Sequence, residues 1–323
     1  MKQEFNNGIA YFGDALETLK QIESDSVDSI ITSPPYYQLR DYGFNEQWGL
    51  ESDYKDYLNK MVNLMRELKR VLKPTGTMWI NLGDTFSTQQ AGNTEWGNGV
   101  GNNKIYEKNN PKRYNGNIPN KSLMLIPHRF AIRCIDELGL ILRNDIIWAK
   151  PNAMPESVTD RFSKKHEFIF FFTKQTDYYF DLDLVRDKLT YPEESTKPFR
   201  KSCLSDIGLQ NGKHSSHSNP NGKNPGDVSD FWEITTKPNP KNHYATYNSE
   251  LIRKPLIAGS PVGGVILDCF GGTGTTCFSA VQFDRRFIYI DANKEYYDNF
   301  VKEMSYQDSH YKLNFDSDSQ KVG

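Results

Sequence analysis

The chain has 323 residues and a formal charge of −2 at pH 7, from 39 Lys and Arg against 41 Asp and Glu. With 37% hydrophobic and 13% aromatic residues, 23 glycines and 16 prolines, it is typical of a folded globular protein and unlike a disordered, collagenous or coiled-coil chain. It has no run of about 18 apolar residues and no apolar leader, so we expect a cytoplasmic protein without a membrane segment.

The first part of the chain alternates strand and helix patterns. Residues 27–32 (VDSIIT) predict a buried strand that runs into the segment TSPPYY. Ser52 is expected to cap a helix whose apolar residues recur at helical spacing until Pro74 and Gly76 end it. Residues 77–82 (TMWINL) predict the next strand.

The rest of the chain continues this alternation around two polar segments, 85–121 and 181–248. The second segment lacks periodicity and is rich in turn formers, which predicts an irregular lobe or a long insertion. The other predicted elements are, in order, a helix at 122–138 ended by Gly139, strands at 140–148 and 167–173, a helix near 250–258, a strand at 265–270, a helix after a glycine-rich turn, and a strand at 286–291. This alternation predicts an α/β fold with a mostly parallel sheet.

Charges are distributed unevenly along the chain. Residues 11–67 carry eleven acidic and five basic residues, whereas 104–121 and 197–223 each carry five basic residues against one acidic residue. Both basic segments are rich in Gly, Asn, Ser and Pro. They fit either solvated surface loops or loops that contact nucleic-acid phosphates and base edges, and charge alone does not decide between the two.

The cysteines and histidines do not form a metal-ligand pattern. The four cysteines stand singly without a C-x-x-C pair, which argues against a zinc ribbon or a disulfide framework. His166 and Glu167 begin the segment HEFIF, which lacks the second histidine of a zinc protease helix, so we expect no metal site. Cys269 and Cys277 have apolar neighbours and are expected to be inert core residues.

A glycine-rich turn in LDCFGGTGTTC (267–277) lies between a predicted strand and a predicted helix, where small residues let a ligand approach the backbone N–H groups. Asp291, nineteen residues after Gly272, could accept hydrogen bonds from ribose hydroxyls. The dinucleotide fingerprint fits only in part because Cys277 occupies the third glycine position, and the Gly-Lys-Ser/Thr of a P-loop is missing. Asp268 and the threonines of the turn suit an ammonium and a carboxylate, which favours S-adenosylmethionine; a purely structural turn is the alternative.

The segment TSPPYY begins at the carboxyl end of the first predicted strand, the edge where open α/β sheets bind their ligands. Its two prolines stiffen the backbone and supply carbonyl groups without N–H groups. A planar amino group would find the hydroxyl of Ser33, the carbonyl of Pro34 and the aromatic face of Tyr36 there. Taken alone, the segment fits a rigid turn packed by tyrosines better.

Together the two motifs resemble the amino-group DNA methyltransferases, which modify the exocyclic nitrogen of cytosine or adenine. Segments similar to that family are FGDALETLKQI (12–22), DSIITSPPYYQLRDYG (28–43), LKPTGTMWINLGD (72–84), residues 142–174, residues 243–261 and LDCFGGTGTT (267–276). Their order, with the catalytic segment first and the cofactor turn last, resembles the circularly permuted beta class. The resemblance implies a doubly wound, mostly parallel, seven-stranded Rossmann-like sheet with an irregular target-recognition insertion.

The resemblance also implies how the chain is divided. A catalytic half would span 1–180, with a polar DNA-contacting loop at 85–121; a target-recognition region would span 181–242, and a cofactor-binding half 243–323. The residues expected to contact DNA are Lys112, Arg113, Lys197, Arg200 and Lys201, which lie in the two basic segments, and Arg161, which lies in a segment similar to the family. Implied partners are double-stranded DNA and a cognate restriction endonuclease, and we expect a monomer or a weak homodimer.

Site residues are carried over from the family onto matching positions. The target base would be received by Ser33, Pro34, Pro35 and Tyr36. The residues implied in binding S-adenosylmethionine are Asp14, Thr32, Thr246, Tyr247, Asp268, Phe270, Gly271, Gly272, Gly274, Thr275, Thr276 and Asp291. In this family Asp268 would lie near the ammonium, Asp291 would hold the ribose and Asp14 would contact the adenine edge.

The implied reaction is direct methyl transfer to a flipped-out base, because the amino group is otherwise inside the duplex. A cytosine-carbon methyltransferase uses a Pro-Cys nucleophile, which this sequence lacks. In the family, Ser at the position of Ser33 is mostly associated with cytosine N4, and Asp or Asn with adenine N6, so we expect cytosine N4 with adenine N6 as the alternative. A nicotinamide-dependent oxidoreductase and a non-catalytic DNA-binding relative are further alternatives.

Overall fold

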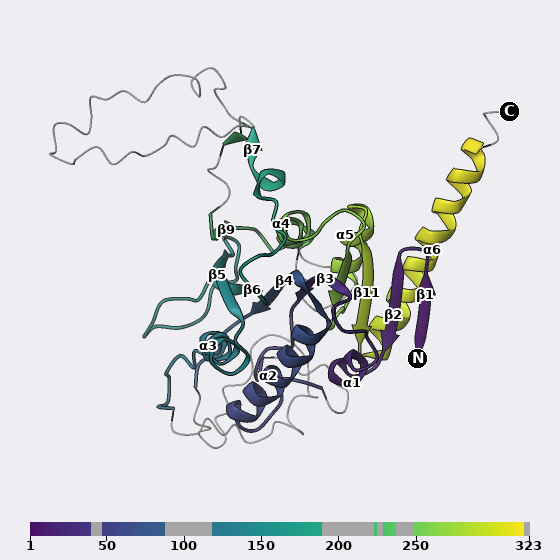
Figure 1. The fold of residues 1–323 in the computed structure, drawn as a ribbon. Coiled ribbons are helices and arrows are strands. Elements are labelled where there is room, and N and C mark those ends of the chain that lie inside the picture. Colours follow the sequence, from purple (N-terminus) through teal and green to yellow (C-terminus); the bar gives the residue numbers. More distant parts are fainter. Residues whose placement is uncertain (40–46, 88–117, 189–222, 225–228, 237–247, 320–323) are drawn as a thin grey trace, which may run out of the picture.

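The structure is a computed structural model that describes residues 1–39, 47–87, 118–188, 223–224, 229–236 and 248–319. Within these residues, one mixed sheet of nine strands forms the centre of the molecule (Figure 1). Its strands, in spatial order, are β1 (Lys2–Phe5), β2 (Gly8–Phe12), β11 (Arg286–Asp291), β10 (Val265–Asp268), β3 (Val27–Thr32), β4 (Leu72–Leu82), β6 (His166–Thr173), β5 (Ile141–Ala149) and β9 (Phe231–Glu233). The expected α/β class is confirmed.

Most neighbouring strands of this sheet are parallel. Strands β2, β11, β10, β3 and β4 run the same way, β6 is antiparallel to both of its neighbours, and β9 is parallel to β5. The run from β2 to β5 is the expected seven-stranded sheet. Strand β1, in an antiparallel hairpin with β2, and the short strand β9 add one strand at each edge.

Strands β10 and β3 form the point where the strand order reverses. The chain leaves β3 through α2 (Tyr54–Val71) toward β4 on one side, and leaves β10 through α5 (Thr275–Gln282) toward β11 on the other. In open α/β sheets, ligands bind in the crevice outside the carboxyl ends of the strands at such a reversal. The two sequence motifs follow β3 and β10, so the fold brings them to one crevice.

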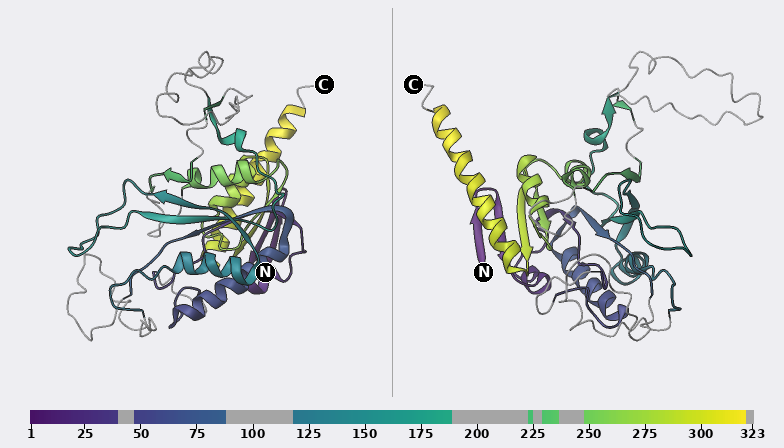
Figure 2. Two further views of the ribbon diagram at one scale, coloured as in Figure 1. Left: turned by 60° about the vertical axis from the view of Figure 1, so that its left-hand side comes forward. Right: turned by 180° about the vertical axis from the view of Figure 1, so that it is seen from behind.

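Helices cover both faces of the sheet (Figure 2). One apolar cluster joins α1 (Ala15–Leu19), α2 and α3 (Ile126–Leu138) to one face of the sheet. A second joins α4 (Ser249–Gly259), α5 and α6 (Lys294–Ser319) to the other face. Residues of β4 alternate between them, because successive strand side chains point to opposite faces: Met78 and Ile80 enter the first cluster and Trp79 the second.

The structure corrects the start of two predicted helices. Helix α2 is capped by Asp53, whose side chain accepts a hydrogen bond from Lys55 N, and Ser52 precedes this cap. Helix α3 starts at Ile126, four residues after the predicted start at 122, because the carboxylate of Asp84 accepts hydrogen bonds from the backbone N–H groups of Leu125 and Ile126. This cap comes from a distant segment, so the local pattern could not show it.

The segment 181–248, predicted to be irregular, contains only short elements in its described part. They are the 3₁₀ helix η1 (Leu182–Val185), the two-stranded pair β7 (Asp187–Lys188) and β8 (Lys223–Asn224), and β9. Strand β9 joins the main sheet beside β5, so part of this segment belongs to that sheet. No helix among the described residues is long and apolar enough to cross a membrane.

Candidate active site

A hydrogen bond between two neighbouring strand ends connects the motifs. The hydroxyl of Thr32, the last residue of β3, donates to Asp268 Oδ1, at the end of β10, at 2.7 Å. Asp268 is 2% exposed and also accepts from the Thr276 hydroxyl and from Phe270 N. Its carboxylate therefore holds the glycine turn onto β3, while its predicted contact with a cofactor ammonium stays a prediction.

The glycine turn adopts a backbone that requires glycine at two positions. Gly272 has φ +51° and Gly274 has φ +82°, a region that other residues rarely adopt. A Cβ on Gly274 would also lie 2.3 Å from the ring of Phe300. The N–H of Gly272 donates to Asp291 Oδ2 at 2.7 Å, so the acid predicted from its spacing in the sequence does reach the turn.

A pocket opens over this crevice. It is lined by Asp14, Ala15, Ser33, Pro35, Trp48, Cys269, Phe270, Gly272, Asp291, Ala292, Asn293 and Tyr296, and its empty volume, including the open mouth, is about 580 Å³. These residues come from segments that follow β2, β3, β10 and β11, together with Trp48. A concave pocket that combines apolar rings with a few polar groups is typical of a small-molecule site.

Aromatic residues and two carboxylates form much of the pocket wall. The rings of Trp48 and Phe270 meet edge to face with centroids 5.3 Å apart. The indole N–H of Trp48 donates to Asp14 Oδ2 at 2.9 Å, while Asp14 Oδ1 caps α1 by accepting from Glu17 N. Burial raises the pKa of Asp291 to about 6. An aromatic wall beside carboxylates fits a flat, positively charged nucleoside.

The other residues predicted to bind the cofactor lie around the turn. Gly271 packs on the ring of Tyr289, where a Cβ would lie 2.2 Å from the nearest ring atom. Thr275 begins α5, with its hydroxyl 3.3 Å from that of Thr273, and Thr276 is buried against Asp268. The predicted residues Thr246 and Tyr247 lie outside the described residues.

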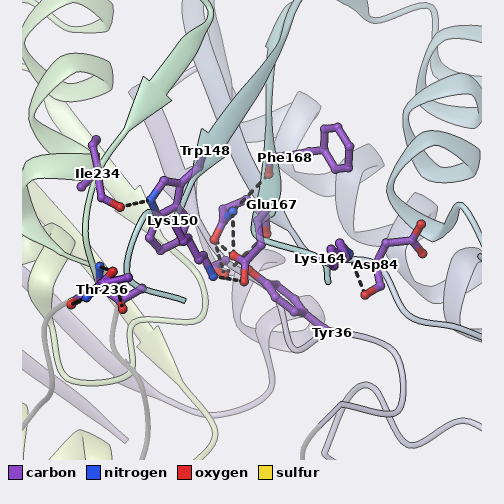
Figure 3. A network of polar contacts seen from close by, with 12 residues as sticks. Tyr36, Asp84, Trp148, Lys150, Lys164, Glu167, Phe168, Ile234 and Thr236 are labelled. Carbon is purple, nitrogen blue, oxygen red and sulfur yellow. Dashed lines mark hydrogen bonds and ion pairs between the residues drawn. The ribbon is translucent and has the colours of Figure 1, made fainter. Parts of the chain in front are cut away.

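The TSPPYY turn lies at the edge of this pocket. Ser33 donates to Asn81, at the end of β4, with its Oγ 3.3 Å from Asn81 Oδ1. The Tyr36 hydroxyl lies 2.8 Å from Asn81 Oδ1 and 2.6 Å from Glu167 Oε2 (Figure 3). Glu167 in turn forms an ion pair with Lys150. Ser33 and Pro35 line the pocket, so the TSPPYY turn forms part of the pocket wall.

The residues of the site that were not predicted from the sequence include Trp48, Asn81, Lys150 and Glu167. Asn81 and Glu167 lie on adjacent antiparallel strands, and only the pairing of β4 with β6 brings them to Tyr36. The strand patterns around them were visible, but their pairing was not. Trp48 lies in a connection whose path no periodicity predicts.

Of the six residues predicted to contact DNA, only Arg161 lies within the described residues. Its guanidinium pairs with Glu156 and lies 3.8 Å from the ring centre of Phe86. The nearby Lys164 donates to the backbone oxygen of Asp84 at 2.8 Å, and burial lowers its pKa. The other predicted DNA contacts, Lys112, Arg113, Lys197, Arg200 and Lys201, lie outside the described residues. No group of three metal-ligating side chains occurs within the described part of the chain.

Comparisons with known proteins agree with this geometry. Residues 27–302 match the N6/N4 methyltransferase family described as DNA methylase. The chain is 36% identical over 313 residues to the type II methyltransferase M.Cfr9I of Citrobacter freundii, covering 95% of this chain and 90% of that protein. It is 34% identical over 288 residues to the type II methyltransferase M.SmaI of Serratia marcescens, covering 88% of this chain and 86% of that protein.

Solved structures show the same fold. The PvuII DNA methyltransferase, titled cytosine-N4-specific, superposes with a TM-score of 0.59 at 19% identity, over 92% of this chain and 86% of that one. A putative DNA modification methylase from Thermus thermophilus, in complex with S-adenosyl-L-methionine, gives 0.55 at 21% identity, over 92% and 94%. The chain therefore belongs to the N6/N4 DNA methylase family, whose members are S-adenosylmethionine-dependent DNA methyltransferases.

Proposed function

We propose that this DNA methyltransferase methylates the exocyclic N4 amino group of a cytosine in double-stranded DNA, as the modification enzyme of a type II restriction-modification system. The observation that carries the proposal is the position of Ser33, which lines the cofactor pocket while its hydroxyl is oriented by Asn81. The names of the relatives M.Cfr9I and M.SmaI support the type II role. Adenine N6 is the alternative target.

The cofactor pocket suits S-adenosylmethionine, which supplies an electrophilic methyl group on a sulfonium. Asp291 would accept hydrogen bonds from the ribose, and Trp48 and Phe270 would flank the flat part of the cofactor. The carboxylate of Asp14 would face its adenine edge. The two acids also match the net positive charge of the sulfonium nucleoside, since opposite charges attract strongly in a partly buried pocket.

The catalytic turn would activate the amino group by presenting acceptors to it. Because the Ser33 hydroxyl donates its own proton to Asn81, its lone pairs remain available for an N–H of the target base. The Pro34 carbonyl would accept the second N–H. These hydrogen bonds draw the nitrogen lone pair out of conjugation with the ring and aim it at the methyl group. The nitrogen–methyl bond forms as the sulfur–methyl bond breaks, sulfur keeps the electron pair, and the nitrogen then loses one proton to water.

Tyr36 would hold the flipped base. Its hydroxyl shares the Asn81 acceptor with Ser33 and also reaches Glu167, so the ring cannot rotate freely. Stacking of a base on an aromatic ring is worth about 1–3 kcal/mol, which offsets part of the few kcal/mol that unstacking costs. Positioning supplies most of the rate enhancement in such a site, and no covalent intermediate is required.

The test is transfer of labelled methyl groups from S-adenosylmethionine to duplex DNA, followed by digestion to nucleosides and identification of the modified base. We expect N4-methylcytosine, and no product with Ser33→Ala or Tyr36→Ala. Ser26→Ala is a matched control, because Ser26 precedes the same strand at its opposite end and its hydroxyl donates to Glu23 O. Formation of N6-methyladenine would refute the choice of base, and active Ser33→Ala would refute the role of the turn.

Sequencing of DNA from cells that express the chain would report the sequence context of the modified base. If the chain is the modification enzyme of a type II system, that DNA resists cleavage by the cognate endonuclease. The oligomeric state, predicted to be a monomer or a weak homodimer, is measured by analytical ultracentrifugation.

A further inference from the structure

We propose that the ion pair between Lys150 and Glu167 positions the target-base pocket, so that both residues are needed for fast methyl transfer although neither lines the cofactor pocket. This inference rests on the roles proposed above for Ser33 and Tyr36. It does not depend on which base is methylated. Lys150 directly follows β5 and Glu167 lies near the start of β6, at the ends of these strands nearest the catalytic turn.

Glu167 contacts the pocket through one carboxylate oxygen. Oε2 lies 2.6 Å from the Tyr36 hydroxyl and 3.4 Å from the side-chain nitrogen of Asn81. That nitrogen also donates to Phe168 O at 3.1 Å. These two acceptors orient the Asn81 amide so that its oxygen faces Ser33 and Tyr36. Glu167 thus controls the orientation of both side chains that would receive the base.

Lys150 holds the other carboxylate oxygen, and also contacts an aromatic ring. Its ammonium pairs with Glu167 Oε1 and lies 4.1 Å from the ring centre of Trp148 (Figure 3). The indole N–H of Trp148 donates to Ile234 O at 2.8 Å, in the segment that follows β9. The segment after β9 therefore holds the Trp148 ring by a hydrogen bond, and this ring contacts the ammonium of Lys150. The ammonium in turn holds the Glu167 carboxylate by the ion pair.

The ion pair is not explained by stability. Both side chains are largely buried, with 17% and 18% of their surfaces exposed. Removing charges of this kind from water costs about as much as their attraction returns, so a buried pair is weak evidence for stabilisation. A partly buried charge pair that touches a catalytic tyrosine is better explained by geometry that the reaction needs.

The experiment compares single-turnover methylation of duplex DNA by the full chain and by four variants. Lys150→Met and Glu167→Gln each remove one charge at similar volume, Lys150→Arg keeps the charge, and the double variant removes both. We expect the two single variants to lose about 10- to 100-fold in the rate constant, because misplacement of a reacting group by about 1 Å costs about 10²-fold. Lys150→Arg is expected to keep most of the rate constant of the unmodified chain.

Three further readouts separate positioning from a structural role. The Kd for S-adenosylmethionine and the KM for DNA are expected to stay within about threefold of the unmodified chain. The double variant is expected to be no slower than the slower single variant, because residues that act as a unit are not additive. Lys73→Met is the matched control: Lys73 pairs with Asp28 at 2.8 Å near the start of β3, away from the pocket.

Rate constants within twofold of the unmodified chain in both single variants would overturn the proposal, as would losses that follow melting temperature and occur equally in Lys73→Met. A strict product of the two single effects in the double variant would also overturn it. Failure of the proposed function gives a different result: the modified base is adenine, or Ser33→Ala stays active, while these rate comparisons remain measurable.

Discussion

Substitution of Gly83 by Ala directly tests the geometry proposed for the target-base pocket around Tyr36. Gly83 follows β4, and a Cβ at this position would lie 2.6 Å and 2.8 Å from two carbons of the Tyr36 ring. Carbon atoms in contact lie about 3.5–4.0 Å apart, so the ring must move by about 1 Å. Asn81 and Glu167 hold the hydroxyl of Tyr36, so this movement disturbs the whole TSPPYY turn.

The expected effect on catalysis follows from that displacement. A shift of about 1 Å in a positioned group lowers a rate about 10²-fold, and overpacking costs about 1–3 kcal/mol of stability. Single-turnover transfer of labelled methyl groups to duplex DNA measures the rate, and calorimetric titration with S-adenosylmethionine measures binding. Binding is expected to be unchanged, because Gly83 does not line the cofactor pocket.

Gly263→Ala is the matched control. Gly263 has φ +75° and nothing within 4 Å of an added Cβ, so the substitution strains the backbone by about 1–2 kcal/mol without touching the site. It precedes β10, at the amino end of that strand, whereas the pocket lies at the carboxyl end. If Gly83→Ala methylates DNA as fast as Gly263→Ala at equal stability, the position of the Tyr36 ring does not limit the reaction.

Four other predictions concern the glycine turn and the core. Since burial raises the pKa of Asp291 to about 6, this carboxylate takes up a proton as the pH falls through 6. We therefore expect the Kd for S-adenosylmethionine, measured from pH 8 to pH 5, to rise near pH 6. In Asp291→Asn we expect weaker binding whose Kd does not change over this pH range. The raised pKa has the opposite effect on the free protein, because protonation favours the folded state: the contribution of Asp291 to the free energy of unfolding falls as pH rises from about 4 to 6, which urea titrations of the chain and of Asp291→Asn would show. Asp268→Asn replaces one carboxylate oxygen by an NH₂ group that faces the buried hydroxyl donors of Thr32 and Thr276. We expect this change to lower the free energy of unfolding by about 3 kcal/mol, as measured by urea unfolding. The control is Asp284→Asn, on the exposed turn before β11. Burial raises the pKa of the thiols of Cys134, Cys269 and Cys277 well above their usual value, so a thiol reagent is expected to leave these three unmodified until the protein unfolds; modification in the folded state, read by mass spectrometry, would contradict the burial.

Several elements could be predicted from the sequence because their signals are local. Strand β3 occurs at the predicted residues 27–32, since a short apolar run is bounded by turn formers on both sides. Helix α3 ends at Gly139, which adopts φ +59° without the steric penalty that a Cβ would bring. The burial predicted for Cys269 and Cys277 is confirmed. The predicted start of α3 was wrong, because its cap is supplied by Asp84 from another segment.

The sequence by itself determined the fold class, the family and the two motifs, because β-branched strands, the glycine turn and the TSPPYY segment are each patterns of neighbouring residues. Tertiary structure decided how those motifs meet. Only the adjacency of β3 and β10 joins Thr32 to Asp268, and only the pairing of β4, β5 and β6 brings Asn81, Glu167 and Lys150 to Tyr36. Strand order depends on contacts between residues far apart in the chain, and no local pattern carries that information.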